Sequence, residues 1–421
     1  MHFLWCIFFE ICIVFGAILL FLQQQFNSQF FMEALIANSK ELVGRADTNL
    51  VRYIHDRIEW DARLIALVGA RGVGKTTMLL QHIKMHDNLD EVLFVPADNL
   101  YFTNHTLLDL ATMFYRRGGR KLYIDEIHRY RNWSQEIKNI YDMLPDLHVV
   151  YTGSSILDLE KGGADLSRRR LQYTMYGLSF REYIKLAYGI DVRVHSFDEI
   201  LSSKIDFPYD KYRPLKLFDE YLRIGYYPFF ADKGYHERLS NMLMQTLEVD
   251  IPNFAGMSVG VTGKLRSLLY IIAQSVPFKP NYSKIARDLE MSRNDLKDWF
   301  FYLEKSGMIG LLRSGKLGDS ALTKPEKVFL DNTNLAYAIC DTRPDIGNLR
   351  ETVFYSMAKV KHNVKASEVS DFMIDGYTFE VGGKKKTKKQ IFDVPDSFIV
   401  KDDIEYGTKG IIPLWAFGLE Y

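Results

Sequence analysis

The sequence has few cysteines and no excess of charge of either sign. Of its 421 residues only Cys6, Cys12 and Cys340 are cysteines, and they have neither the density of a disulfide framework nor the spacing of a metal site. Lys and Arg together number 53, as do Asp and Glu. A chain without net charge has no global field that attracts nucleic acid or anionic lipid, so any such contact must be a local patch. These features predict a cytoplasmic protein, and its length allows two or three domains.

The N-terminus lacks the positive region of a secretory signal. Residues 3–22 are almost wholly apolar, Glu10 is their one charge, and no Lys or Arg precedes them. The run is long enough to cross a bilayer, but an acid near its middle costs about 2–3 kcal/mol. We therefore favour residues 1–31 as a dispensable leader or a misassigned start, with the natural product beginning at Met32. A membrane anchor formed by residues 3–22 is the alternative.

A phosphate-binding motif follows the first strand-like segment. Residues 69–76 read Gly-Ala-Arg-Gly-Val-Gly-Lys-Thr and fit the P-loop pattern G-x-x-x-x-G-K-[ST], between an apolar run at 64–68 and a helix start at 77–83. In such a loop the main-chain amides face the phosphates, Lys75 reaches the β- and γ-phosphates, and the Thr76 hydroxyl binds Mg²⁺. We expect ATP to be bound by Gly69, Ala70, Arg71, Gly72, Val73, Gly74, Lys75, Thr76 and Thr77.

A second apolar strand ends in two acids. Residues 121–126 read Lys-Leu-Tyr-Ile-Asp-Glu, so Asp125 is expected to hold Mg²⁺ and Glu126 to orient the attacking water. The next strand ends in small polar residues, among which Thr152 and Ser154 are candidates for a sensor of the γ-phosphate. A plain turn after the strand explains these hydroxyls equally well. Three arginines at 168–170 could stabilise charge in the transition state, although a solvated surface cluster is the commoner reason for such a run.

The first half of the chain alternates apolar runs with helical patterns. Such alternation predicts an α/β fold in which a mostly parallel sheet is covered by helices on both faces. The expected strands cover 64–68, 92–95, 121–125, 148–152 and 171–176, and helices are expected at 106–117 and 133–144. Residues 177–270 have a mainly helical pattern. After about residue 326 the sequence again has the pattern of strands.

Taken together, these motifs resemble those of the prokaryotic AAA+ ATPases that end in a nuclease-like domain of unknown function. The resemblance extends over roughly residues 33–421 and includes Gly-Leu-Ser-Phe-Arg-Glu-Tyr at 177–183. It implies that Asp125 and Glu126 are the Walker B acids, Thr152 the sensor, and Arg169 the arginine of an L-S-G-R motif that completes a neighbour's site. The glycine of that motif is Arg168 here, so Arg168, Arg169 and Arg170 all remain candidates. The resemblance implies catalytic roles for Lys75, Glu126 and Arg169, and self-association.

Two further modules are expected after the ATPase domain at 32–185 and a helical region at 186–280. Residues 281–325 have the spacing of a winged helix-turn-helix, with Ser292 as N-cap and Gly307 as C-cap of the second helix. That helix carries as many acids as bases, so we favour packing or autoinhibition over insertion into DNA.

The last module, at 326–421, resembles the PD-(D/E)xK nuclease fold. A helix is expected to start at Glu351, and a hairpin to turn at Asp375-Gly376. The resemblance implies that Asp371 and Glu380 are the metal-binding acids. The matching lysine position is Gly382, and Lys384 is the nearest candidate, so we favour a degenerate or binding-only module. The lysine run at 384–389 is either a phosphate-attracting patch or a solvated loop.

The function predicted from the sequence is hydrolysis of ATP with Mg²⁺, used as a switch for the C-terminal modules. Two alternatives remain. One is an ATP-regulated DNA-binding or DNA-processing protein, and the other is a non-catalytic interaction protein that binds nucleotide. The client, DNA or protein, is left open.

Overall fold

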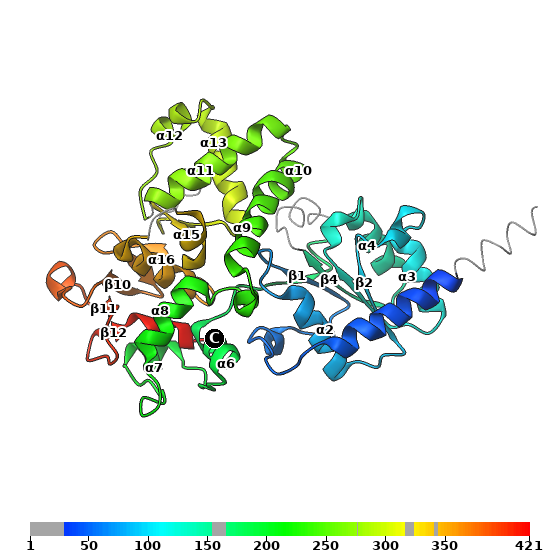
Figure 1. Ribbon diagram of the computed structural model, residues 1–421, viewed down its shortest axis with the longest axis horizontal. Coiled ribbons are helices and arrows are strands. Elements are labelled where there is room, and N and C mark those ends of the chain that lie inside the picture. Colours follow the sequence, from blue (N-terminus) through cyan, green and yellow to red (C-terminus); the bar gives the residue numbers. More distant parts are fainter. Residues whose placement is uncertain (1–28, 154–165, 276, 316–323, 341–343) are drawn as a thin grey trace, which may run out of the picture.

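A five-stranded parallel sheet forms the first half of the protein (Figure 1). The computed structural model describes residues 29–153, 166–275, 277–315, 324–340 and 344–421. The strand order is β2-β3-β4-β1-β5, and every neighbouring pair is parallel. The strands are β1 (Leu64–Val68), β2 (Val92–Pro96), β3 (Lys121–Asp125), β4 (His148–Gly153) and β5 (Leu171–Thr174). The five predicted strands are thus confirmed, with differences of one or two residues at their ends.

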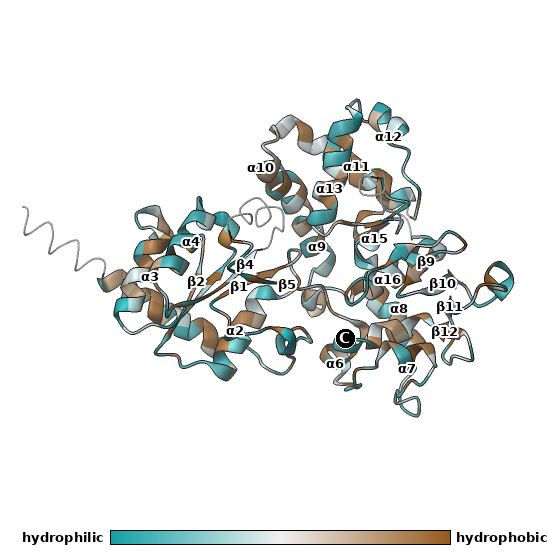
Figure 2. Ribbon diagram, turned by 180° about the vertical axis from the view of Figure 1, so that it is seen from behind, coloured by the Kyte–Doolittle hydropathy of each residue, from teal (hydrophilic) through white to brown (hydrophobic). Residues whose placement is uncertain are grey.

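Helices cover both faces of this sheet because alternate side chains of each apolar strand point to opposite sides. In β1, Ile65 and Leu67 pack in the same core as residues of α2 (Lys75–His86). Leu64 and Ala66 instead share a core with α3 (Leu107–Arg116) and α4 (Trp133–Met143). Figure 2 shows apolar residues along β1 and β4 and hydrophilic residues on the surrounding helices.

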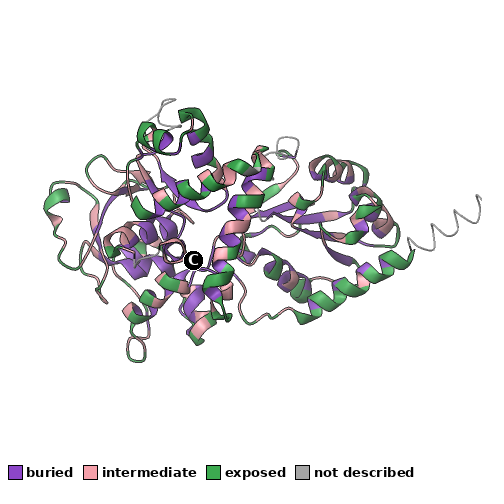
Figure 3. Ribbon diagram, turned by 45° about the horizontal axis from the view of Figure 1, so that its top comes forward, coloured by how far each residue is buried: buried purple, intermediate pink, exposed green. Residues whose placement is uncertain are grey.

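A helix at residues 29–45 lies along the edge strand β2, and much of its outer surface is exposed (Figure 3). The Ser39 hydroxyl accepts a hydrogen bond from the Phe94 amide at 2.9 Å. Covering an edge strand in this way blocks its pairing with another chain. Residues 1–28, including the apolar run at 3–22, lie outside the described residues. Within the described part of the chain, no helix is both long and apolar enough to span a membrane.

A helical layer follows and packs against the α2 side of the sheet. Its elements are η5 (Pro228–Ala231), α9 (Tyr235–Gln245), the π-helical turn η6 (Thr246–Asp250), α10 (Ile251–Ala255), η7 (Val259–Val261), α11 (Thr262–Ser275), α12 (Tyr282–Asp288), α13 (Arg293–Lys305) and α15 (Thr333–Ile339). Ser292 caps α13 through the Asp295 amide, as predicted, whereas the C-cap is Ser306 and the predicted Gly307 follows it with a φ of 74°. An antiparallel pair, β6 (Ile309–Leu312) and β7 (Lys327–Leu330), comes next. The winged-helix assignment stays a prediction.

A second five-stranded sheet, of order β12-β11-β10-β9-β8, lies in the C-terminal half. Its strands are β8 (Lys365–Ala366), β9 (Phe372–Ile374), β10 (Tyr377–Gly382), β11 (Ser397–Lys401) and β12 (Ile411–Pro413). The predicted hairpin is confirmed, since β9 and β10 pair antiparallel around Asp375 and Gly376, which both have positive φ. The prediction that a helix starts at Glu351 is wrong. The helix α16 (Ile346–Ala358) begins earlier because the Asp345 side chain caps it, so Glu351 lies inside it.

Segments far apart in the sequence build the core of this second half. Apolar side chains of α6 (Phe180–Tyr188), α7 (Phe197–Leu201) and α8 (Pro214–Ile224) pack with α16, the sheet and the last turn η9 (Leu414–Leu419). The C-terminus therefore lies beside α6, between the two sheets (Figure 1). The remaining short turns are η1 (His55–Arg57), η2 (Leu100–Thr103), η3 (Ile127–Arg129) and η8 (Lys388–Ile391).

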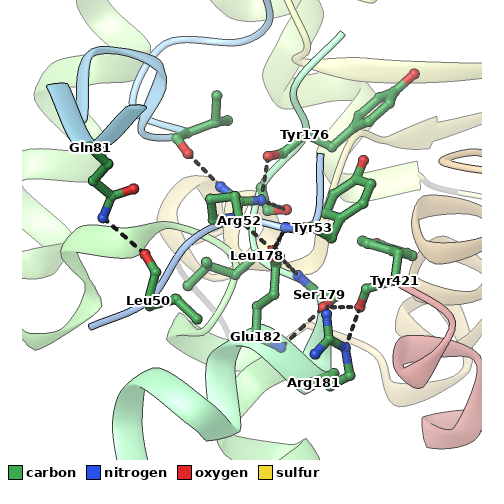
Figure 4. Close-up of polar contacts among 12 residues, drawn as sticks. Leu50, Arg52, Tyr53, Gln81, Tyr176, Leu178, Ser179, Arg181, Glu182 and Tyr421 are labelled. Atoms are coloured by element: carbon green, nitrogen blue, oxygen red, sulfur yellow. Dashed lines mark hydrogen bonds and ion pairs between the residues drawn. The ribbon is translucent and has the colours of Figure 1, made fainter. Parts of the chain in front are cut away.

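One buried ion pair joins the two halves, as Figure 4 shows. Arg52 and Glu182 have side chains that are 5% and 1% exposed, and Arg52 Nε lies 3.0 Å from Glu182 Oε1. The Arg52 guanidinium also donates to the carbonyl oxygens of Val73, Tyr176 and Gly177. Every donor group of Arg52 therefore has a partner, which is the condition under which a buried charge is tolerated.

We expect the change Glu182→Ala to destabilise the protein by about 3–5 kcal/mol, because it leaves the Arg52 charge buried without its partner. Denaturant unfolding followed by circular dichroism measures this change. The control Asp219→Ala removes the exposed ion pair with Arg223 and should cost about 0.5 kcal/mol at most. Equal, small effects of the two substitutions would contradict the structural role of the pair.

Candidate nucleotide-binding site

The P-loop connects the carboxyl end of β1 to the first turn of α2. Its first glycine is required by packing, since a Cβ atom at Gly69 would lie 2.2 Å from the Met175 carbonyl oxygen. The last glycine, Gly74, has a φ of 99° and directly precedes the helix. L-residues with a side chain rarely adopt this backbone conformation. The loop thus places main-chain amides at the positive end of α2, which is an arrangement that binds anions.

Lys75 is the first residue of α2, and its side chain folds back over the loop. Its ammonium donates to the carbonyl oxygens of Gly69 at 2.9 Å and Ala70 at 2.8 Å. Burial lowers the pKa of Lys75 to about 8, although the nearby Asp125 and Glu126 oppose this shift. A lysine in this position carries its charge into a poorly hydrated site, where attraction to a phosphate is strong.

A chain of hydrogen bonds connects four of the predicted residues at the carboxyl edge of the sheet. The Thr76 hydroxyl donates to Asp125 Oδ2 at 2.8 Å, and the Thr152 hydroxyl donates to Asp125 Oδ1 at 2.5 Å. The Glu126 amide donates to the Thr152 oxygen at 2.9 Å. Thr152 is fully buried, so its hydroxyl serves both to hold the Asp125 carboxylate and to position the next residue. Ser154 lies outside the described residues.

Glu126 occupies a left-handed backbone conformation with a φ of 50°, immediately after β3. Its carboxylate lies 2.6 Å from Arg129 Nε, and a quarter of its side chain is exposed. Non-glycine residues in this conformation cost energy and occur frequently at functional sites. Glu126 directly follows β3, so it lies at the same carboxyl edge of the parallel sheet as the P-loop, and its side chain is partly exposed.

The arginines at 168–170 lie near the amino ends of the parallel strands, opposite the carboxyl ends where the P-loop lies. Arg170 precedes β5, whose first residue Leu171 is paired with Ile65 at the beginning of β1. Arg169 forms an ion pair with Asp142 at 3.1 Å, near the last turn of α4. The P-loop follows the opposite end of β1, and five strand residues span about 13 Å. In this conformation Arg169 is therefore not brought to the P-loop of its own chain.

A small pocket of about 140 Å³ borders the P-loop on the side of α2. Its apolar walls come from the segment before β1, from the loop itself and from the second half of the chain. Its lining includes Leu50, Val73, Thr77, Leu178, Leu186 and Pro228. Gln81, which also lines the pocket, donates to the carbonyl oxygen of Leu50 (Figure 4) and to that of Asp47. Apolar surfaces next to a phosphate-binding loop are suited to a nucleoside base.

Three later segments cover the outer side of the P-loop. Arg71 forms two hydrogen bonds to Asp250, both at 3.2 Å. A Cβ atom at Gly72 would lie 2.8 Å from the Met242 sulfur, and one at Gly307 would lie 2.8 Å from Ala70 Cβ. The loop is thus in direct contact with η6, α9 and the turn after α13. Any change of the loop conformation must displace these segments or be resisted by them.

A second cluster of acids forms in the C-terminal half. Lys327, from β7, lies 2.7 Å from Glu351 Oε2 and 2.8 Å from Asp371 Oδ1. Burial raises the pKa of Glu351, and the charge of Asp371 raises it further. Burial acts to lower the pKa of Lys327, but the nearby carboxylates of Asp371 and Glu351 have the larger effect, so the pKa of Lys327 is raised. Asp371 and Lys327 also line a pocket of about 960 Å³.

The predicted lysine of this cluster has to be corrected. The structure brings Lys386, not Lys384, into an ion pair with Glu380. Lys384 instead accepts a hydrogen bond at its carbonyl oxygen from Lys401. The reason is that the chain leaves β10 at Gly382 and turns back, so the fourth residue after the strand faces Glu380. Asp371 accepts a hydrogen bond from the Val381 amide at 3.0 Å and so lies beside β10, the strand that carries Glu380. The metal-binding role of these two acids stays a prediction.

Sequence reasoning missed Arg52, Lys327 and the position of Glu351. Arg52 is a single charge in an otherwise apolar stretch, Leu-Val-Arg-Tyr-Ile at 50–54, and such isolation indicates a buried, partnered residue. Lys327 carries no comparable signal, because its partners lie 24 and 44 residues away in the sequence.

Comparison with known proteins gives two family matches. Residues 61–184 match a family described as AAA domain, and residues 215–345 match a domain of unknown function, DUF8612. A curated relative, the uncharacterized protein MJ1637 of Methanocaldococcus jannaschii, is 28% identical over 387 residues, which cover 82% of this chain and 81% of the relative.

Solved structures are similar over parts of the chain. The Walker-type ATPase PABY2304 of Pyrococcus abyssi aligns with a TM-score of 0.41 and 16% identity, covering 66% of this chain and 91% of the other. AMPPCP-bound DnaA from Aquifex aeolicus aligns with a TM-score of 0.25 and 12% identity, covering 60% and 85%. The family match falls on the helix-covered parallel sheet, so residues 61–184 are similar to an AAA domain and have the fold of a P-loop ATPase.

The pKa of Lys75 predicts how nucleotide binding depends on pH. Lys75 is charged below its pKa of about 8 and loses its proton as the pH rises above that value. An anionic phosphate favours the protonated form, so we expect the affinity for Mg²⁺–ATP to fall about tenfold between pH 7 and pH 9. Calorimetric titration at several pH values measures this fall. The variant Lys75→Arg, which keeps its charge, should flatten the profile, and an unchanged slope in that variant would assign the pH dependence to another group.

Proposed function

We propose that the chain binds ATP at the P-loop and hydrolyses it with Mg²⁺. The observation that supports this most is that hydrogen bonds join Thr76, Asp125 and Thr152 at one edge of the sheet, next to the P-loop whose carbonyl oxygens hold the Lys75 ammonium. A positive charge, a hydroxyl and a carboxylate beside main-chain amides are the groups that phosphoryl transfer requires, since this chemistry depends on positioning and charge stabilisation. The apolar pocket lined by Leu50 and Leu178 gives room for the base.

The residues present fit a magnesium ion. Mg²⁺ prefers oxygen ligands and usually keeps several waters, so one hydroxyl and one carboxylate are a sufficient protein contribution. Thr76 and Asp125 would hold the ion, which would neutralise charge on the β- and γ-phosphates. Thr152 fixes the orientation of the Asp125 carboxylate through its 2.5 Å hydrogen bond. It thereby leaves the other carboxylate oxygen directed at Thr76.

Glu126 is the proposed base that orients the attacking water. It follows Asp125 directly, its left-handed turn exposes the carboxylate, and Arg129 balances its charge. Arg169 lies near the amino ends of the strands, away from the P-loop of its own chain. From there it could reach the nucleotide-binding site of a second copy. We therefore propose that an arginine of 168–170 completes a neighbour's site, and that the protein self-associates when active.

The contacts around the P-loop support a role as a switch. Arg71 is held by Asp250, and Arg52 joins the loop carbonyl of Val73 to α6. A triphosphate that attracts Lys75 would remove its hydrogen bonds to Gly69 and Ala70 and reshape the loop. The segments in contact with the loop would then move with it, so that the nucleotide state is passed to the helical layer and to the C-terminal sheet.

The variant Glu126→Gln tests the proposed base. We expect it to bind Mg²⁺–ATP as the native chain does and to hydrolyse it at least a hundredfold more slowly, because the amide cannot accept a proton from water. Phosphate release under multiple turnover measures the rate, and calorimetry measures the affinity. The control Glu91→Gln changes an exposed acid before β2 and should retain full activity. Hydrolysis at the native rate by Glu126→Gln would show that another group orients the water.

A second candidate function is binding or cleavage of a polynucleotide by the C-terminal module. It is favoured by the pocket of about 960 Å³, whose lining combines Asp371 with Lys279, Lys327 and Lys365. Carboxylates bind a divalent cation, and lysines attract phosphates, so the lining is suited to a phosphodiester. Lys327 between Glu351 and Asp371 also allows a binding-only module, in which the ammonium replaces a metal ion.

Labelled DNA incubated with Mg²⁺ or Mn²⁺, with and without ATP, tests this second function. If the module cleaves, Asp371→Asn should abolish cleavage, because the substitution removes one negative charge from the metal site. The matched control Asp393→Asn changes an exposed acid of the same module and should cleave normally. Equal cleavage by both variants would exclude Asp371, whereas salt-dependent binding without cleavage would support the binding-only form.

A further inference from the structure

Three histidines meet at the far end of α2 from the P-loop. His82 and His86 lie four residues apart on the last turns of this helix, and His55 comes from the turn η1. The distances between the ring centroids are nearly equal, at 5.2 Å for His55 and His82, 5.1 Å for His82 and His86, and 5.3 Å for His55 and His86. One nitrogen of each ring lies within 4.8 Å of a nitrogen of each other ring.

This triangle has the dimensions of a three-histidine metal site. Zinc–nitrogen bonds of about 2.0–2.1 Å in tetrahedral geometry place two ligand nitrogens about 3.3 Å apart. His55 Nε2 and His82 Nδ1 are 3.1 Å apart, which is already close to that separation. The third ring, His86, is exposed, and its ligand nitrogen lies within 4.8 Å of those of the other two rings.

The surroundings orient the rings as they are oriented around a metal ion. Asp56 Oδ1 lies 3.1 Å from His55 Nδ1, so the carboxylate favours a proton on that nitrogen and leaves a lone pair on Nε2. Trp60 stacks on His82 at 3.6 Å with an interplanar angle of 13° and donates its ring N–H to the His55 carbonyl oxygen at 3.0 Å. These contacts hold two of the rings in place before any ion arrives.

The His82 ring is buried, and its Nδ1 has a hydrogen-bond contact with His55 Nε2. His82 is 3% exposed, and in the described part of the chain its Nε2 has no hydrogen-bond partner. A neutral imidazole offers a lone pair to a metal.

We propose that His55, His82 and His86 bind one divalent transition-metal ion of the zinc class. Neutral imidazole nitrogens suit Zn²⁺, Cu²⁺ or Ni²⁺, whereas Mg²⁺ and Ca²⁺ prefer oxygen, so this site is distinct from the magnesium site at Thr76 and Asp125. The ion would fix η1 against α2. Because Arg52 stands three residues before His55, the ion would also stabilise the segment that holds the P-loop carbonyl of Val73.

Metal titration of the full chain, stripped with a chelator and free of any affinity tag, tests the proposal. With Zn²⁺ in a calorimeter we expect one ion per chain, and a rise in the midpoint of thermal unfolding on binding. Co²⁺ as a spectroscopic probe should give the strong visible absorption of a low-coordinate nitrogen site. Excess Mg²⁺ should not displace either ion.

Matched variants assign the ligands. His86→Gln changes an exposed side chain, so the fold should be retained, and affinity for Zn²⁺ should fall at least tenfold. His236→Gln, an exposed histidine on α9, and Asp125→Asn, at the magnesium site, should bind Zn²⁺ as the native chain does. Native affinity in His86→Gln, the absence of binding at millimolar Zn²⁺, or loss of the ion in Asp125→Asn would each overturn the proposal.

Discussion

The Arg52 guanidinium is the contact on which the joining of the two halves depends. It is buried, and it binds at once the P-loop carbonyl of Val73, the carbonyls that follow β5, and the carboxylate of Glu182. Glu182 in turn caps α6 together with Ser179, whose hydroxyl donates to the carbonyl oxygen of Tyr421. A single charge thus connects the phosphate-binding loop to the last residue of the chain. A buried charge that loses its partners strongly destabilises the protein, so these segments are constrained to move together.

The helix α2 brings the functional features of the first half into one element. Its first turn carries Lys75 and Thr76 at the P-loop, and its last turns carry the histidine cluster. Between them Gln81 holds the segment before β1 through the carbonyls of Asp47 and Leu50. The same segment contains Arg52. The nucleotide pocket, the buried ion pair and the proposed metal site therefore act on one short stretch of chain, residues 47–60, that lies along this helix.

Much of the first half could be predicted from the sequence because its signals are local. Strand positions follow from apolar runs, and the P-loop is defined by glycines whose backbone conformations are needed within a few residues of each other. Asp125 and Thr152 were predicted because both end parallel strands, and parallel strands end at one edge. The second half depends on distant contacts. Lys327 reaches Asp371 over 44 residues, and Lys386 replaces the predicted Lys384 because the chain turns back after β10. Neither pairing has a local pattern.

We propose that the P-loop binds Mg²⁺–nucleotide and that this binding is transmitted to the second half of the chain through Arg52. Hydrogen exchange of the full chain, with and without a non-hydrolysable ATP analogue and Mg²⁺, measures both the binding and its transmission most directly. We expect slower exchange in residues 69–77 and a concerted change in 176–182 and 414–421. Identical exchange in both conditions would contradict the binding site, and protection confined to 69–77 would contradict the coupling.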